Sequence, residues 1–199
     1  MGYLVQGAHQ PSFSISGDLL IEHISIRDEF GASIVVHIGG KTVADIWGGH
    51  SNESGSQCWV KETFVNVFTI TKTITGLAAL ILIDRGIISP NEKIATYWPE
   101  FAVYGKQDMR IRDIISHTAG VPRWEKPVTL ADICDFDQAV TLLAAQALWW
   151  TSGTASDYHP FTRGFLIGQV IRKVTGKTLK DFIAEDMAGL LGADFLARD

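Results

Sequence analysis

The sequence predicts an α+β fold in which one β-hairpin precedes four or five helices. Residues 31–38 and 41–47 are rich in β-branched side chains and are separated by Gly39-Gly40, a pattern typical of a hairpin turn. After position 70, apolar residues recur at helical spacing in several segments. The 199 residues include 46% hydrophobic side chains, enough for a sizeable core, and this length favours one domain over residues 1–199.

The strongest helix is predicted over residues 70–83, and Asp84-Arg85-Gly86 ends it with a glycine stop signal. Apolar side chains occupy nearly every side of this segment. We therefore expect the helix to be buried all round rather than laid on a surface. The apolar stripe that defines its period consists of Ile70, Ile74, Leu77 and Ile81.

Shorter helices are predicted downstream from the same kind of apolar spacing. A polar loop over residues 151–160 precedes one of them, and Gly176 ends it. The predicted segments are residues 111–115, 138–148, 165–174 and 179–187.

Charge and composition exclude several classes of function. The 22 acidic residues outnumber the 17 basic ones, which argues against a nucleic-acid or anionic-membrane surface. No apolar stretch approaches the about 20 residues that span a bilayer, and residues 1–20 lack the basic start and apolar run of a secretory signal. We therefore expect a cytoplasmic protein without nucleic-acid or membrane partners, in which Cys58 and Cys134 are buried free thiols.

Motifs for phosphate and metal chemistry are not met. Gly40-Lys41-Thr42 and Gly176-Lys177-Thr178 resemble the end of a P-loop, but neither has the earlier glycine that the motif requires. His117 and His159 have no histidine neighbour at metal-ligand spacing, and the H-E-x-x-H motif is absent. The G-x-S-x-G motif is absent too, which disfavours an α/β-hydrolase.

Three side chains are candidates for nucleophilic chemistry. Lys72 lies near the start of the predicted apolar helix, and Thr69 lies three residues earlier on the same face. A hydroxyl at a helix N-terminus, beside a lysine whose pKa burial would lower, is the arrangement of an activated nucleophile. Tyr158 lies in the polar loop, from which its hydroxyl can reach a cleft. The alternatives are a capping threonine, a lysine that extends to solvent and a tyrosine packed at a helix entry.

Taken in order, several segments match the pattern of one family. They are residues 35–49, 67–73, 84–86, 97–101, 116–120, 153–159, 164 and 174–176. Together they resemble the serine β-lactamase/penicillin-binding-protein superfamily, and most closely its class C β-lactamase-like esterases. The resemblance implies that Thr69 is the nucleophile of the S-x-x-K motif, Lys72 its activator and Tyr158 the co-base, with the Thr69 backbone N–H as one oxyanion donor. Trp149 or Trp150 would line the cleft or pack in the core.

Two departures from the family pattern matter. Thr69 stands where the family has serine, and its extra methyl group restricts χ1 and crowds the attack path. The family's third motif, a Lys- or His-containing triplet on a strand, has no counterpart before Asp199. The resemblance therefore implies the N-terminal half of a β-lactamase/transpeptidase-like domain, with the C-terminal sheet strands missing. Through its open edges, a two-stranded hairpin is expected to self-associate.

Two functional hypotheses follow from these observations. The first is an esterase-like hydrolase or acyltransferase that forms an acyl-enzyme with a small-molecule ester or amide. This chemistry needs no metal and no organic cofactor, because the hydroxyl and its bases suffice. The second is a non-catalytic, truncated relative, retained as a binding module or simply a shortened gene product, which the threonine at position 69 and the missing third motif favour.

Overall fold

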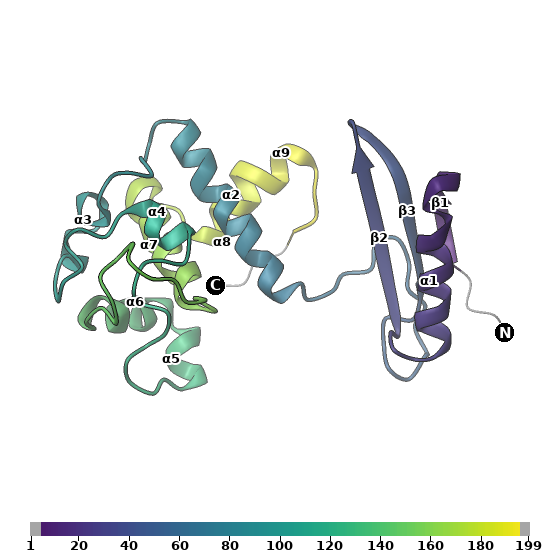
Figure 1. Cartoon of the computed structure of the whole chain (residues 1–199), viewed down its shortest axis with the longest axis horizontal. Coiled ribbons are helices and arrows are strands. Elements are labelled where there is room, and N and C mark those ends of the chain that lie inside the picture. Colours follow the sequence, from purple (N-terminus) through teal and green to yellow (C-terminus); the bar gives the residue numbers. More distant parts are fainter. Residues whose placement is uncertain (1–4, 196–199) are drawn as a thin grey trace. The chain divides into compact units, whose positions relative to one another are not determined.

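The computed structural model describes residues 5–195, and the chain divides into two compact units between Asn66 and Val67 (Figure 1). The first unit contains a small sheet and one α-helix, and the second contains helices and loops. This combination is the predicted α+β class. That residues 1–199 fold as a single domain stays a prediction.

The first unit holds a three-stranded antiparallel sheet in the order β1-β3-β2. The predicted hairpin is confirmed as β2 (Gly31–Ile38) and β3 (Lys41–Gly49). Gly39 and Gly40 join these strands with φ values of 56° and 75°, a left-handed conformation that glycine adopts without strain. The prediction of only two strands was wrong, because β1 (Val5–His9) pairs with the other side of β3.

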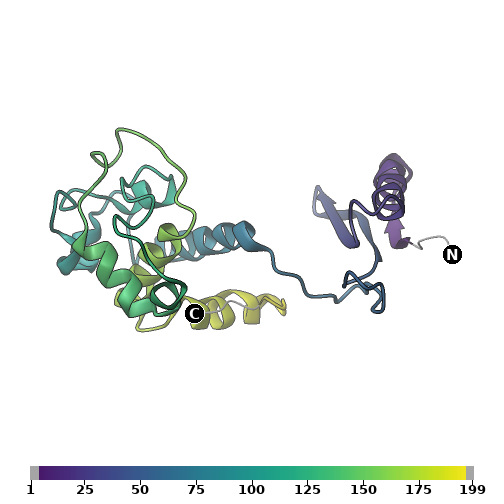
Figure 2. The same cartoon turned by 90° about the horizontal axis from the view of Figure 1, so that it is seen from below.

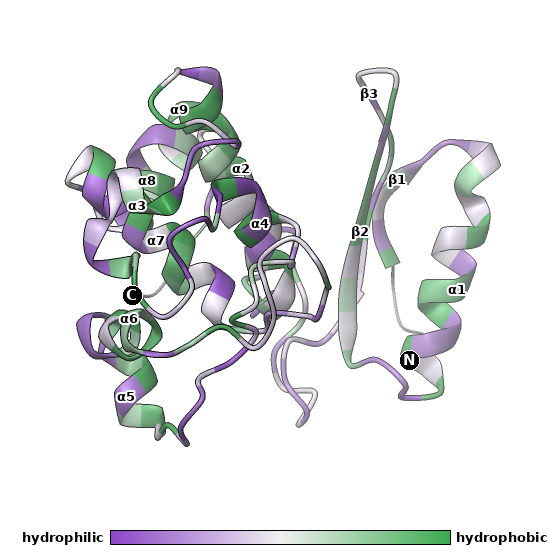
Figure 3. Cartoon of the chain, turned by 60° about the vertical axis from the view of Figure 1, so that its left-hand side comes forward, coloured by the Kyte–Doolittle hydropathy of each residue, from purple (hydrophilic) through white to green (hydrophobic). Residues whose placement is uncertain are grey.

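A helix that was not predicted, α1 (Ser14–Ser25), lies against the sheet (Figure 1, Figure 2). Leu20 and Ile24 of α1 are buried with Ile46 of the central strand β3, and they form the core of this unit. The remaining surface of α1 carries both polar and apolar residues (Figure 3). Self-association through a sheet edge stays a prediction.

The second unit begins with a 3₁₀ turn, Phe68–Ile70, that leads directly into α2 (Thr71–Asp84). Its core packs α2 and α6 against α7, and the most deeply buried side chains include Leu82, Leu143 and Leu166. The other helices are α3 (Ile94–Tyr97), α4 (Ile111–Ile115), α5 (Leu130–Cys134), α6 (Phe136–Ala145), α7 (Thr162–Thr175), α8 (Leu179–Ile183) and α9 (Gly189–Leu191). A π-helical turn, Ala184–Ala188, connects α8 to α9.

The prediction that α2 is buried all round was wrong. Within the second unit, Ile70, just before α2, is 61% exposed and Leu77 is 44% exposed. Ile81 of the same apolar stripe packs against the core. The buried face carries small side chains, with Ala78 and Ala79 packed in the core that also contains residues of α7. Small residues permit close helix packing, whereas an all-round apolar pattern cannot show which side of a helix faces its neighbour.

Both cysteines also differ from the expectation, because Cys58 and Cys134 are free but exposed. A buried lysine, Lys106, was not predicted from the sequence and is fully inaccessible to solvent. Its ammonium donates a hydrogen bond to the carbonyl of Gln146, just after α6, and lies 5.2 Å from the centre of the Phe101 ring. Burial lowers the pKa of Lys106 to about 8.

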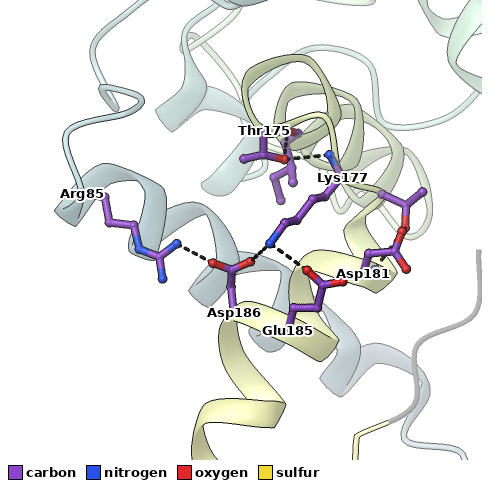
Figure 4. Close-up of polar contacts among 8 residues, drawn as sticks. Arg85, Thr175, Lys177, Asp181, Glu185 and Asp186 are labelled. Atoms are coloured by element: carbon purple, nitrogen blue, oxygen red, sulfur yellow. Dashed lines mark hydrogen bonds and ion pairs between the residues drawn. The ribbon is translucent and has the colours of Figure 1, made fainter.

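An ion cluster ties the end of α2 to the C-terminal helices (Figure 4). Arg85, which follows α2, donates to one carboxylate oxygen of Asp186 at 2.8 Å, and Lys177 donates to the other at 2.6 Å. Lys177 also pairs with Glu185 at 2.9 Å. The hydrogen bond from Lys177, followed by that from Arg85, lowers the pKa of Asp186.

Replacing Asp186 with Asn is expected to lower the midpoint of thermal unfolding by about 2 °C at neutral pH. Because the pKa of Asp186 is lowered in the folded state, its stabilisation is present above the unfolded-state pKa of about 4 and is lost as the pH falls through the folded-state pKa. Calorimetry across this acidic range should therefore show the two midpoints converging at low pH. Glu185→Gln is the matched control with a smaller effect, since the Glu185 side chain is 63% exposed and that of Asp186 only 19%. Equal midpoints for wild type and Asp186→Asn at neutral pH would contradict the prediction.

Candidate active site

The start of α2 presents the predicted hydroxyl and lysine next to each other in the second unit. Thr69 lies in the 3₁₀ turn that precedes α2 and is exposed, while Lys72 is the second residue of α2 and is half-buried. Phe68, immediately before Thr69, has a φ of +41°, which is unusual for a bulky residue. Such outliers persist where the surrounding structure enforces them, and they are common at functional sites.

Tyr158 reaches this turn from the loop between α6 and α7. Its hydroxyl donates a hydrogen bond to Thr69 Oγ1 at 3.3 Å, across 89 residues of sequence. Lys72 Nζ lies 5.2 Å from the centre of the Tyr158 ring. The structure therefore brings together Thr69, Lys72 and Tyr158, the three site residues predicted from the sequence. Tyr158 is 47% exposed to solvent.

The surroundings of Tyr158 favour its ionised form. The hydrogen bond with Thr69 is the largest effect that lowers the pKa of Tyr158, and the Lys72 ammonium and the Arg163 charge lower it further, while partial burial opposes them. A phenolate at this position would accept a hydrogen bond from the Thr69 hydroxyl, reversing the donor and acceptor. This reversal is the arrangement that proton removal from Thr69 requires.

Two histidines lie beside Tyr158. The His117 ring centre is 5.2 Å from that of Tyr158, and His117 Nδ1 accepts a hydrogen bond from the backbone N–H of His159 at 3.0 Å. His159 is fully buried, and its Nδ1 donates to the carbonyl of Asp157 at 2.7 Å, because a carbonyl oxygen can only accept. Burial is the largest cause that lowers the pKa of both rings, so both imidazoles are neutral at pH 7.

The two histidines hold the Tyr158 loop in place. Their ring centres lie 5.5 Å apart, a proximity that sequence spacing did not reveal, but both Nδ1 atoms are used in hydrogen bonds to the loop. Within residues 5–195, no group of three or more His, Cys, Asp and Glu side chains is arranged to hold a metal ion.

Asp157 fixes the backbone on the other side of Tyr158. One of its carboxylate oxygens accepts the Tyr158 backbone N–H at 2.8 Å, and the other pairs with Arg123 at 3.2 Å. Arg123 in turn lies over the ring of Trp149, 5.3 Å from its centre. Trp149 is thus a surface residue at 48% exposure, whereas the half-buried Trp150 donates from Nε1 to the Thr118 carbonyl at 3.3 Å.

Arg163, in the first turn of α7, belongs to the site but was not identified from the sequence. It is 6% exposed, and its Nη1 donates to the backbone carbonyl of Lys72 at 2.7 Å. An arginine in a helix usually extends to solvent, so no pattern of neighbouring residues marked this one as buried. The contact connects α7 directly to the turn of α2 that carries Lys72.

A shallow groove of about 630 Å³ opens next to Tyr158. Apolar and charged side chains both line the groove, and three of the lining residues, Asp157, Tyr158 and Pro160, belong to the Tyr158 loop. The lining residues are Arg123, Trp124, Glu125, Lys126, Pro127, Val128, Ile133, Asp157, Tyr158, Pro160 and Phe161. A groove of this composition can accept an apolar group beside a polar reaction centre.

Comparison with known proteins identifies the class to which this fold and site belong. Residues 19–194 match the family profile described as Beta-lactamase, and the chain is a member of the β-lactamase family. It is 31% identical to the esterase/beta-lactamase LipL of Mycobacterium tuberculosis (strain ATCC 25618 / H37Rv) over 195 residues, which are 98% of this chain and 45% of LipL. The predicted family resemblance is thereby confirmed.

Solved structures agree with this assignment. A family VIII carboxylesterase superposes with a TM-score of 0.89 at 36% sequence identity, covering 95% of this chain and 52% of that one. A novel penicillin-binding protein homologue from Caulobacter crescentus superposes with a TM-score of 0.90 at 30% identity, covering 95% and 51%. The chain thus spans about half the length of these relatives. In addition, no helix within residues 5–195 is both long and apolar enough to cross a membrane.

Proposed function

We propose that this chain is a carboxylic-ester hydrolase or acyltransferase that works through an acyl-enzyme on Thr69. The observation that carries the proposal is the hydrogen bond of 3.3 Å between Tyr158 and Thr69 Oγ1, with the Lys72 ammonium 5.2 Å from the Tyr158 ring. Nucleophile, cation and base are therefore within reach of one another. The similarity to an esterase/beta-lactamase and to a family VIII carboxylesterase supports the same class of reaction.

The first half-reaction acylates Thr69. The Tyr158 oxygen takes the Thr69 proton while Oγ1 forms a bond to the carbonyl carbon of the ester, and Lys72 stabilises the phenolate beforehand. The negative oxygen of the tetrahedral intermediate is expected to face the Thr69 backbone N–H at the helix start. The bond to the leaving alkoxide then breaks, and Tyr158 returns the proton to it, which releases an alcohol.

The second half-reaction frees the enzyme. Tyr158 takes a proton from a water molecule, and the oxygen of that water attacks the acyl carbon. In the acyltransferase case a second alcohol takes the place of water. The bond to Thr69 Oγ1 breaks, the threonine recovers a proton, and a carboxylic acid or a new ester leaves. The apolar groove next to Tyr158 is the proposed place for the acyl or alcohol part of the substrate.

One observation favours a second candidate, a non-catalytic relative that binds an ester without turning it over. Thr69 carries a methyl group where the family pattern has serine, and a β-branched side chain has fewer χ1 rotamers with which to direct Oγ1 at a carbonyl. A misplacement of about 1 Å can cost about 10²-fold in rate. The two candidates differ in turnover, not in binding.

Release of p-nitrophenol from a short-chain p-nitrophenyl ester tests the proposal. The wild-type chain is expected to release more moles of product than there are moles of protein, which a single acylation of each chain cannot achieve. A release limited to the background rate, together with saturable ester binding in equilibrium dialysis, would contradict the proposal and establish the binding module.

A further inference from the structure

The Arg163 guanidinium is a buried cation without a counter-carboxylate. Its side chain lies under the site at 6% exposure, and none of the carboxylates within residues 5–195 lies at ion-pair distance from it. Nε has no hydrogen-bond partner among these residues either. Burying a charge in this way is costly, and replacing such a group by an apolar one is often neutral or stabilising. We therefore expect the buried Arg163 charge to have a role that offsets the free energy lost by burying it.

The position of the guanidinium is defined by the first turns of α2. Nη1 holds the Lys72 carbonyl at 2.7 Å, and Nη2 lies 3.0 Å from the place where a Cβ would stand on Gly76. Lys72 and Gly76 are four residues apart, so the guanidinium lies along one helical turn, against the side of α2 where a side chain is missing. A larger residue than glycine at position 76 would push the guanidinium away from the Lys72 carbonyl.

The titratable groups that interact with Arg163 come from three segments. They are Lys72 on α2, whose backbone carbonyl Arg163 holds, His117 after α4, and Tyr158 and His159 in the loop before α7. Tyr158 is the member of this set that can become an anion, because the others are cationic or neutral. The nearby Asp157 carboxylate is already engaged by Arg123.

The effects of Arg163 on these groups point in one direction. Its charge contributes to lowering the pKa of both imidazoles, and it contributes, after Thr69 and Lys72, to lowering the pKa of Tyr158. Because both histidines are neutral, Lys72 and Arg163 are the cations of this set. Both favour the phenolate form of Tyr158. In return, Tyr158 raises the pKa of Arg163, against the larger effect of burial.

We propose that Arg163 is a positioning residue: through its hydrogen bond to the Lys72 carbonyl it holds the turn of α2 whose ammonium lies beside the Tyr158 ring. The inference rests on the proposed function, in which Tyr158 is the base. The inference gives the buried Arg163 guanidinium a role in the reaction, beyond packing α7 against α2. A purely structural arginine would stabilise α7 against α2 and leave the ionisation of Tyr158 unchanged.

Arg163→Met and Arg163→Lys test this proposal in the full chain. The phenolate of Tyr158 is titrated by ultraviolet difference absorbance, with the Tyr158→Phe titration subtracted to remove the other tyrosines. Arg163→Met should move the Tyr158 titration to higher pH by about one pH unit, and Arg163→Lys should restore most of the difference. Arg172→Met is the matched control, since Arg172 lies on the same helix but pairs with the exposed Asp137, and it should leave the titration unchanged.

Thermal unfolding and kinetics separate this role from a structural one. Arg163→Met should unfold at the same or a higher temperature than wild type, because it removes an unpaired buried charge. In ester hydrolysis the rising limb of the pH profile of kcat/KM should move to higher pH with the Tyr158 titration. An unchanged Tyr158 titration in Arg163→Met would overturn the inference, whatever its stability. A shifted titration in a chain without ester turnover would uphold the inference on Tyr158 and refute the proposed function alone.

Discussion

Replacing Thr69 with Ala is expected to reduce ester hydrolysis to the background rate, a loss of about 10³- to 10⁶-fold in kcat. The change removes Oγ1, which is the atom that accepts the Tyr158 hydrogen bond and forms the acyl bond in the proposed mechanism. Thr69 is exposed, so the loss should occur without a change in thermal stability beyond about 1 °C. Steady-state kinetics with a p-nitrophenyl ester measure the effect.

Thr69→Ser is the informative companion variant. It keeps the hydroxyl and removes the methyl group, so it should be at least as active as wild type, and up to about 10²-fold more active if the methyl group displaces Oγ1 from the attack path. Turnover by Thr69→Ala at the wild-type rate would show that Thr69 is not the nucleophile. A loss of activity in Thr69→Ser would show that the site is shaped around the methyl group.

Replacing Tyr158 with Phe is expected to lower kcat by about 10²- to 10⁴-fold, the usual contribution of a general base. The ring and its contacts with Lys72 and His117 remain, while the hydrogen bond to Thr69 is lost. The pH dependence should also change. Because the pKa of Tyr158 is lowered, wild-type kcat/KM should rise with pH through a value below the ordinary pKa of tyrosine, about 10, and this limb should vanish in the variant.

Tyr104→Phe is the matched control for Tyr158→Phe, since Tyr104 is a surface tyrosine at 65% exposure outside the site. It should keep the wild-type rate and the wild-type pH profile. If Tyr158→Phe also kept both, Tyr158 would not be the base, and Lys72 would have to remove the Thr69 proton without it.

Local patterns were sufficient to predict where some elements end. The hairpin turn at Gly39-Gly40 and the end of α2 before Gly86 were both predicted, because glycine marks left-handed backbone irrespective of tertiary context. The meeting of Thr69 with Tyr158 was predicted through the family resemblance, since no local pattern connects residues 89 positions apart.

The errors concern tertiary contacts, which a local pattern does not determine. Burial of α2 on every side was predicted because apolar residues surround the helix, whereas Leu77 is exposed and the buried face carries the small residues Ala78 and Ala79. Arg163 escaped notice because its role depends on the Lys72 carbonyl of another helix. The short strand β1 has four exposed residues and only Val5 partly buried, so it has little periodicity to detect.

Covalent labelling is the most direct test that Thr69 is the nucleophile. The wild-type chain and Thr69→Ala are incubated with a fluorophosphonate probe, which reacts with activated hydroxyl groups, and the modified peptide is located by mass spectrometry. The mechanism predicts a stable adduct on Thr69 in wild type and none on that peptide in Thr69→Ala. An unlabelled wild-type chain, or an adduct that persists elsewhere in Thr69→Ala, would contradict it.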